Sequence, residues 1–395
     1  MDNKKWEFVD KSTATVAEDT RPSLTYWKDV WNRFKSNKIA ILGLILLAII
    51  VAIVVIGPMT TDVSYSDQKL EYGNIPPVLD IVDLGDGDYV YVHKEYKLIS
   101  VTADGELLGV PEMTANDMMN RTKTFDVNGK EVVIDYSKAA DKSLPPDALT
   151  YDLTVNGEPI DASNTVSKWN KTYLLGTDKL GRDVWVRLLY GGRTSLLVGV
   201  TAALFNAFIG VFYGGISGYE GGKVDNIMMR IVDFINSIPL MLIVILIGVF
   251  VNDTGATTII LTIGLVYWVG MARQVRGQVM SLKEQEFVMA ARTLGASKKR
   301  IIVRHMIPNA LGPIVVSMMM SVPSAMFTEA FLSFVGLGVS APMASWGTMA
   351  NDALGGIRSF PYLLIAPSVA IALTMIALNF VGDGLRDALD PQQRK

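Results

Sequence analysis

The stretch IAILGLILLAIIVAIVVI (Ile39–Ile56) contains no polar side chain. As an α-helix these 18 residues would be about 27 Å long, close to the hydrocarbon thickness of a bilayer. A helix in a soluble core would show polar residues along one face, and this run shows none. It therefore predicts a membrane-spanning helix. The run follows a polar leader of nearly forty residues, whereas a cleaved signal sequence begins almost at once, so we expect it to stay in the mature protein.

Five further apolar stretches follow this run. They are Thr194–Ser217, Ile231–Val251, Ala256–Ala272, Asn309–Val335 and Phe360–Val381. Several are interrupted by polar residues or proline, which helices in a bundle tolerate better than a lone anchor does. The interruptions are Asn206, Asp233, Asn236, Pro239, Pro323, Glu329 and Pro367. Glycines such as Gly210, Gly214, Gly215 and Gly264 favour close helix approach. We expect an all-α polytopic membrane protein of about six transmembrane helices.

Lysine and arginine predict the orientation. They gather in the leader before Ile39–Ile56 and again between Ala256–Ala272 and Asn309–Val335. An even number of predicted crossings separates these two groups. The positive-inside rule places both groups, and with them both termini, in the cytoplasm. The groups are Lys28, Arg33, Lys35 and Lys38, and then Arg273, Arg276, Lys283, Arg292, Lys298, Lys299, Arg300 and Arg304.

The same orientation places residues 59–180 outside the cell, and this segment is predicted to be a folded, β-rich domain. Strand-like runs flank two-residue turn signals at Asp104-Gly105, Asn128-Gly129 and Asn156-Gly157. Asn-Gly and Asp-Gly supply the positive φ angles of tight hairpins. The expected strand runs are Tyr89–Ala103, Thr124–Val127, Glu131–Tyr136 and Tyr151–Val155. We expect this domain to fold autonomously.

Composition excludes several kinds of site. The chain has no cysteine, so disulfides and thiolate chemistry are excluded. His93 and His305 lie far apart without a carboxylate at ligand spacing, so we expect no metal site and no cofactor. The net charge of −3 does not suggest nucleic acid. No phosphate-binding P-loop and no Ser/His/Asp set occur, so we expect no ATPase or other enzyme activity in this chain.

The basic segment Gln274–Pro308 is predicted to form two short helices joined at an angle. Its first half reads as a helix with Val275, Val279, Leu282 and Met289 along one face. Gly295 supplies a left-handed turn and Ser297 can cap a second helix, Lys298–Met306, limited by Pro308. Such an element suits docking into a groove on another protein. By charge alone, an ordinary basic loop would be the favoured interpretation of this segment.

The residues of this segment resemble a known family. AARTLG (290–295), continuing to Ile307-Pro308, is similar to the "EAA" loop by which membrane subunits of ABC importers bind their ATPases, with Met289 in place of the glutamate. The fuller string 286–297 resembles the dipeptide/oligopeptide/nickel permease branch. Strings at 175–183, 187–193, 329–338 and 382–391 agree with its C-type permeases. The resemblance implies that the ATPase-coupling residues are Glu286, Ala290, Ala291, Arg292, Gly295, Ala296 and Pro308.

The resemblance also implies a fold and partners. The fold would be that of a type I ABC importer permease in the bacterial plasma membrane. The partners would be a B-type permease, two cytoplasmic ATPases, an extracellular substrate-binding lipoprotein and membrane lipid, with peptide as cargo. The predicted parts are a cytoplasmic leader (1–38), a first helix (39–58), the insertion (59–180), a permease core (181–382) containing the coupling loop 274–308, and a cytoplasmic tail (383–395).

Three alternatives remain open at this point. Nickel or another small solute could replace peptide as cargo. An ion-coupled secondary transporter would need internal repeats and several intramembrane ionisable residues, of which Glu329 is the clear candidate. A membrane-tethered receptor would need only one or two spans. We interpret Glu329 as a carboxyl group that hydrogen-bonds helices together in preference to a substrate contact.

Overall fold

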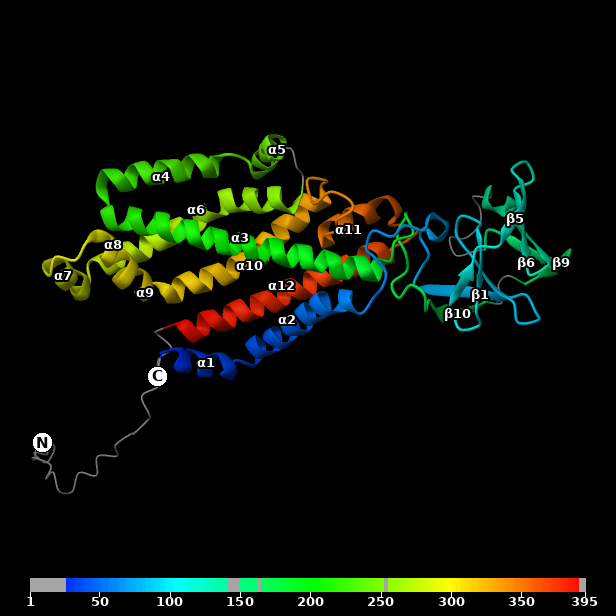
Figure 1. Ribbon diagram of the computed structural model, residues 1–395, viewed down its shortest axis with the longest axis horizontal. Helices are drawn as coiled ribbons and strands as arrows, with labels where there is room; N and C mark the ends of the chain where they lie inside the picture. The colour runs from blue at the N-terminus through cyan, green and yellow to red at the C-terminus, as the bar shows by residue number, and fades with distance from the viewer. Residues whose placement is uncertain (1–25, 141–148, 162–164, 252–254, 391–395) are drawn as a thin grey trace, which may run out of the picture.

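The computed structural model describes residues 26–140, 149–161, 165–251 and 255–390. It consists of a bundle of long helices with a β domain at one end (Figure 1). The β domain is inserted between the first and second long helices of the chain, where the sequence predicts it. The prediction of an inserted β-rich domain is confirmed as two sheets.

The first long apolar run forms a helix as predicted. Helix α1 (Tyr26–Ser36) precedes α2 (Lys38–Ile56), and the Asn37 side chain caps the start of α2 by accepting hydrogen bonds from its first backbone N–H groups. Gly43 lies directly against α12 (Tyr362–Leu389), where a Cβ atom would come within 2.6 Å of Phe380. The first span therefore packs along the last one.

Three long helices form the centre of the bundle: α3 (Val184–Glu220), α6 (Ala256–Lys283) and α10 (Leu311–Phe334). The pair α3 and α6 packs most closely. A Cβ atom on Gly214 of α3 would lie 2.3 Å from the carbonyl oxygen of Ala272, and one on Gly218 would lie 2.7 Å from that of Arg276. These glycines are the close-approach positions that small residues are expected to supply in membrane bundles.

The expected span Ile231–Val251 is not one continuous helix. The chain instead forms α4 (Gly222–Ser237) and α5 (Leu240–Val251), which meet at 89°. Ile238 between them is extended (φ −85°, ψ 126°), as the residue before a proline prefers, and Pro239 has no N–H to continue the helix. In the described residues, five helices are long and apolar enough to cross a membrane, or six if the bent pair counts as one.

The β domain contains two five-stranded antiparallel sheets. The first has the order β10-β1-β2-β3-β4 and the second β5-β6-β7-β8-β9. The strands of the first sheet are β1 (Val78–Asp83), β2 (Tyr89–Val92), β3 (Leu98–Val101), β4 (Leu107–Gly109) and β10 (Val166–Trp169). Those of the second are β5 (Glu112–Asp117), β6 (Thr122–Val127), β7 (Lys130–Asp135), β8 (Asp152–Val155) and β9 (Glu158–Ile160).

Two of the predicted turns have the expected geometry. Asn128 and Gly129 have φ of 54° and 82°, and Asn156 and Gly157 have 51° and 84°, as a type I′ hairpin requires. The expected continuous run Tyr89–Ala103 is wrong, because it contains β2, a turn with Tyr96 at φ 56°, and β3. Period-2 patterning does not reveal a turn whose residues are themselves polar and aromatic.

The two sheets share one apolar core. Val90, Leu98, Val132, Ile134 and other side chains from both sheets pack together with almost no exposed surface. His93 is also buried: its Nε2 bonds the carbonyl oxygen of Asn74 and its Nδ1 accepts from the N–H of Glu95. Burial lowers its pKa. In the described residues, no three His, Asp or Glu side chains could hold a metal ion together.

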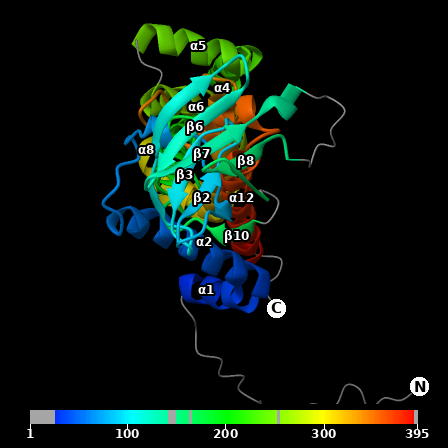
Figure 2. The ribbon, with the colours of Figure 1, turned by 90° about the vertical axis from the view of Figure 1, so that its right-hand side faces the viewer.

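The β domain is joined to the bundle by specific contacts. The Tyr362 hydroxyl at the start of α12 lies 3.0 Å from the carbonyl oxygen of Ile75 and 2.8 Å from that of Thr177. Lys94 donates to the carbonyl oxygen of Ser359 at 2.8 Å. Figure 2, viewed from this end, shows the strands in front of the helices. At the opposite end lie α1, the end of α12 and the short helices α7 and α8, so the two basic groups share one end of the bundle (Figure 1).

Candidate functional site

The predicted coupling segment forms a helix–turn–helix element. Helix α7 (Glu286–Thr293) ends at Leu294 and is followed by Gly295 at φ +78°. The N–H of Ala296 donates to the carbonyl of Ala291, and that of Gly295 donates to the carbonyl of Arg292. This pair of bonds is a Schellman motif, which ends a helix with a left-handed residue. Gly295 therefore sets the change of direction, as predicted from the sequence.

The second arm is more irregular than predicted. The Ser297 hydroxyl caps α8 (Lys298–Ile301), but residues Ile302–Met306 form a π-helical turn, and α9 (Ile307–Asn309) contains Pro308. The expected helix Lys298–Met306 ending before Pro308 is therefore wrong in detail. Proline has no N–H to donate to the carbonyl four residues earlier, and in a regular α-helix its ring would clash with that carbonyl. The wider π-helical turn avoids this clash.

One face of this element is packed and the other is free. Val288 is fully buried, and Ala291 and Ala296 pack with it against Val275 and Val279 of α6. Met289 does not share a face with Val275, Val279 and Leu282 as predicted: its side chain is 51% exposed, because α6 ends at Lys283 and α7 starts a new helical register. The free face of α7 and its turn is formed by Glu286, Phe287, Met289, Ala290, Arg292 and Leu294. We call this set the outer face of α7.

The element is also tied to the end of α3. The Arg292 guanidinium and the Lys283 ammonium both lie 5.8 Å from the ring centroid of Tyr219. Lys298 donates to the Glu220 carboxylate at 2.9 Å. The sequence reasoning missed Tyr219 and Glu220, because they lie 64 or more positions before these partners in the chain, and a helix-ending Tyr-Glu pair has no distinctive pattern. These contacts link α7 and α8 to α3, the longest helix in the described part of the chain.

Glu329 is completely buried in α10. One of its carboxylate oxygens accepts from the Ser195 hydroxyl of α3 at 2.8 Å and the other from Ser333 at 2.8 Å. The backbone N–H of Trp346, the first residue of α11 (Trp346–Ala353), lies 3.3 Å from the same Ser195 hydroxyl. The carboxyl group thus connects three helices, which is the arrangement expected of a residue that holds the bundle together.

We predict that Glu329→Gln retains assembly and most of the transport activity that the family resemblance implies, because glutamine preserves the size of the side chain and still accepts one hydrogen bond. Glu329→Ala would leave two buried hydroxyls without an acceptor, at a cost of about 1–3 kcal/mol each. Thermal unfolding in detergent and substrate uptake measure the two effects. Complete loss of uptake in a normally assembled Glu329→Gln protein would instead assign Glu329 to the substrate path.

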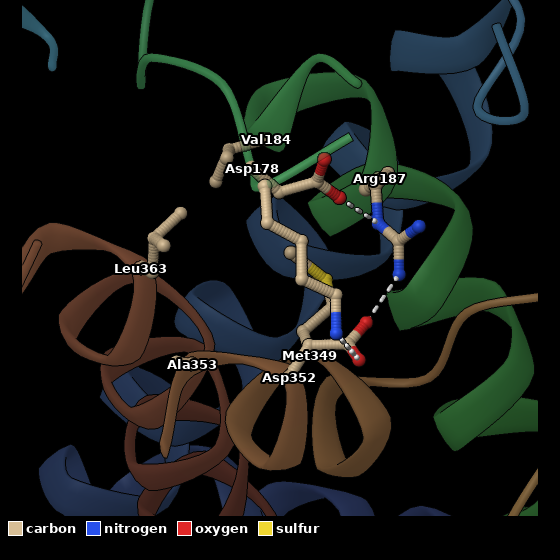
Figure 3. Close-up of a pocket in the computed structure, with 8 residues that line it drawn as sticks. Asp178, Val184, Arg187, Met349, Asp352, Ala353 and Leu363 are labelled. Atoms are coloured by element: carbon tan, nitrogen blue, oxygen red, sulfur yellow. Dashed lines mark hydrogen bonds and ion pairs between the residues drawn. The ribbon is translucent and has the colours of Figure 1, made fainter. Parts of the chain in front are cut away.

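A charged cluster connects the segment just before α3 with α11, and Figure 3 shows Asp178, Arg187 and Asp352 from it. Asp178 accepts from Arg182 Nε at 2.7 Å and lies 3.6 Å from Arg187 Nε. Asp352 of α11 lies 3.3 Å from Arg187 Nη2 and 3.5 Å from Arg182 Nη2. Both arginine side chains are at most 5% exposed. In the sequence, the segment 175–183 indicates this cluster only through Asp178 and Arg182, an acidic and a basic residue four positions apart. Asp352 lies too far along the chain for any local pattern to include it.

Comparison with known proteins identifies the family. Residues 210–395 match the model of the binding-protein-dependent transport system inner membrane component, and residues 25–77 match the N-terminal transmembrane domain of oligopeptide transport permease C. The oligopeptide transport system permease protein OppC of Bacillus subtilis is 37% identical over 95% of this chain and 93% of its own length. The chain belongs to the OppC/DppC family of transport system permeases.

Two further relatives show that the likeness includes the β insertion. The dipeptide transport system permease protein DppC of Bacillus subtilis is 38% identical over 95% of this permease and 88% of its own length, and DppC of Lactococcus lactis is 34% identical over 99% and 98%. Alignments of that extent run through residues 59–180 as well as the helical core. The family likeness therefore extends beyond the strings at 175–183, 187–193, 286–297, 329–338 and 382–391 into the insertion. A chain of the MetNI methionine ABC transporter aligns with 51% of this permease at 19% identity and a TM-score of 0.44.

Proposed function

We propose that this permease is the C-type transmembrane subunit of an ATP-binding-cassette importer for peptides, and that it forms the translocation path together with a paired B-type permease. The observation that supports this most is the alignment over almost the whole chain with permeases named for oligopeptide and dipeptide transport. ATP hydrolysis would be carried out by partner subunits, since the chain itself carries no phosphate-binding loop.

We propose that two ATPases dock on the assembled pair of permeases, one of them on the outer face of α7. The face combines exposed apolar side chains, Phe287 at 39%, Met289 at 51% and Leu294 at 87%, with the small Ala290 and the charges Glu286 and Arg292. Apolar side chains that are this exposed at one end of a helix are typical of a docking surface. Because the inner face is packed on α6 and linked to Tyr219, a push on α7 would reach the transmembrane helices directly.

We propose that the end bearing α1, α7 and α8 is cytoplasmic and that the β domain is extracellular. The basic leader and the basic coupling segment share the first end, as the positive-inside rule requires. The β domain at the other end, with its excess of acidic over basic residues, would guard the outer mouth or dock the lipoprotein that delivers substrate.

Uptake by reconstituted proteoliposomes tests the proposal. We expect labelled peptides to accumulate only when the co-purified ATPases, the delivering lipoprotein and ATP on the side of the ATPases are all present. Ionophores, which dissipate ion gradients, should leave this accumulation unchanged. Peptides of graded length and Ni²⁺ serve as competing cargo. Uptake that follows an ion gradient without ATP would support a secondary transporter, and uptake of Ni²⁺ without peptide would change the cargo.

A further inference from the structure

Helix α1 packs against the ends of two long helices through one of its faces. Val30 and Phe34 are buried in a small apolar core that includes the last turn of α12. A Cβ atom on Gly384 of α12 would lie 3.3 Å from the Phe34 ring, and one on Gly312 at the start of α10 would lie 3.6 Å from the Tyr26 hydroxyl. The other faces of α1 are therefore free to contact something outside the chain.

The outward side of α1 carries an aromatic row next to a basic row. Trp27 and Trp31 are four positions apart, so they lie on one side of the helix, and they are 57% and 49% exposed. Lys28 and Lys35 are seven positions apart and form the neighbouring row. Lys35 Nζ lies 5.7 Å from the centroid of the Trp31 ring, so the two rows are in contact.

The exposed charge of α1 is positive. Asp29 is the only acidic residue of this helix, and its carboxylate pairs with Arg33 at 2.7 Å. Lys28, Lys35 and Lys38, the first residue of α2, are all exposed. A layer of acidic lipid headgroups attracts each lysine that comes close to it, so such a layer complements this side of α1.

Helix α1 ends where the chain can enter a bilayer. Helix α2 begins at Lys38, two positions after α1 ends, and is long and apolar enough to cross a membrane. Only 17% of its apolar window is buried inside the protein, a smaller share than in the other candidate spans of the described residues. Helix α2 therefore lies at the rim of the bundle, where lipid surrounds it. A helix joined to its polar end lies at the surface of the same membrane.

We propose that α1 is an interfacial helix that binds acidic phospholipid. Trp27 and Trp31 would lie at the boundary between headgroups and acyl chains, which tryptophan prefers. The stems of Lys28 and Lys35 would run along this boundary while their ammonium groups bind lipid phosphates. A docked protein would also cover apolar side chains, but lysines beside the most exposed span favour a phosphate surface. The inference concerns α1 alone, so its failure would leave the proposed peptide import unaffected.

Fluorescence quenching in vesicles tests this placement. Because the chain has no cysteine, Trp31→Cys and Asn32→Cys each supply a single thiol for a fluorophore, at two exposed positions on different sides of α1. The full-length variants, with the subunits that co-purify, are reconstituted in phosphatidylcholine vesicles. These vesicles contain either phosphatidylglycerol or phosphatidylcholine that carries a nitroxide near the headgroup. Trp27→Cys replaces Trp31→Cys if the latter does not fold.

We expect the nitroxide lipids to quench the fluorophore at position 31 more than the one at position 32. At low salt, labelled phosphatidylglycerol should quench position 31 at least about fivefold more efficiently than labelled phosphatidylcholine, the fold-change that attraction of one lysine produces. Lys28→Gln/Lys35→Gln should remove most of this preference. Lys223→Gln/Lys299→Gln is the matched control, because it removes the same charge from exposed positions of α4 and α8 and should keep the preference.

Four results would overturn the proposal. Equal quenching by the two lipids would exclude a preference for acidic headgroups, and a preference that persists in Lys28→Gln/Lys35→Gln would exclude these lysines as its cause. Quenching of position 31 by aqueous iodide alone would show that this side of α1 faces water. A fluorophore at position 31 that neither iodide nor the nitroxide lipids quench would show that another protein covers it.

Discussion

Gly295→Val is expected to release the ATPases or uncouple their activity while the rest of the permease stays folded. Gly295 has φ +78°, a conformation that costs an ordinary residue about 1–2 kcal/mol and a β-branched residue more. Both Schellman bonds depend on this angle. Valine would favour a different turn, so α7 and α8 would no longer present the outer face of α7 in one arrangement. Co-purification of the ATPases and substrate-stimulated ATP hydrolysis measure the effect.

The surroundings of Gly295 make this test specific. A Cβ atom there would meet nothing within 4 Å, so any loss comes from the backbone angle or from the docked partner and not from a clash inside the chain. Gly295→Asn is the matched control, because asparagine adopts the left-handed conformation readily and should retain docking. Lys299→Glu, at the exposed rim, should alter mainly the salt dependence of association. Wild-type docking and hydrolysis in Gly295→Val would show that the segment is only a basic loop.

The features that the sequence predicted well are those that short stretches determine. The run Ile39–Ile56 is apolar on every side, so no tertiary contact is needed to recognise α2. Asn128-Gly129 and Asn156-Gly157 specify hairpins through the φ angles that these residues tolerate. Gly295 likewise predicts a left-handed turn, because glycine adopts positive φ without steric cost. In each case the physical cause lies within a few residues of the chain.

The features that the sequence predicted poorly depend on residues that are far apart in the chain. Strand β1 pairs with β10, aligning Val78 with Trp169, and neither strand shows strong alternation of its own. The bend between α4 and α5 lies inside an apolar stretch that continues past Pro239, so hydropathy alone predicts one span there. Only the backbone geometry that the residue before a proline prefers indicates a break. The charged cluster brings Arg187 next to Asp352, 165 positions later in the chain. In a single sequence, no local pattern indicates pairs of residues this far apart.

The pair of α3 and α6 connects both ends of the permease, and a single methyl group on it should have a large effect. Helix α6 leads into α7, while α3 carries Arg187 near one end and Glu220 at the other. At Gly214 an added Cβ would lie 2.3 Å from the carbonyl oxygen of Ala272 and 2.9 Å from the N–H of Arg276. Both are backbone atoms of α6 and cannot turn aside, so the helices must separate.

We expect Gly214→Ala to destabilise the bundle by about 1–3 kcal/mol through overpacking, with a lower melting temperature in detergent and reduced recovery of the ATPases. The neighbouring Gly215→Ala is the matched control. Its Cβ would meet only Ile302 Cγ2 at 3.5 Å, an ordinary contact, so helix propensity should make the change neutral or stabilising by about 0.5–1 kcal/mol. Two adjacent, chemically identical substitutions with opposite signs would show that α3 and α6 pack through Gly214. Equal melting temperatures for the two variants would contradict that packing and, with it, the path by which α7 is proposed to move the transmembrane helices.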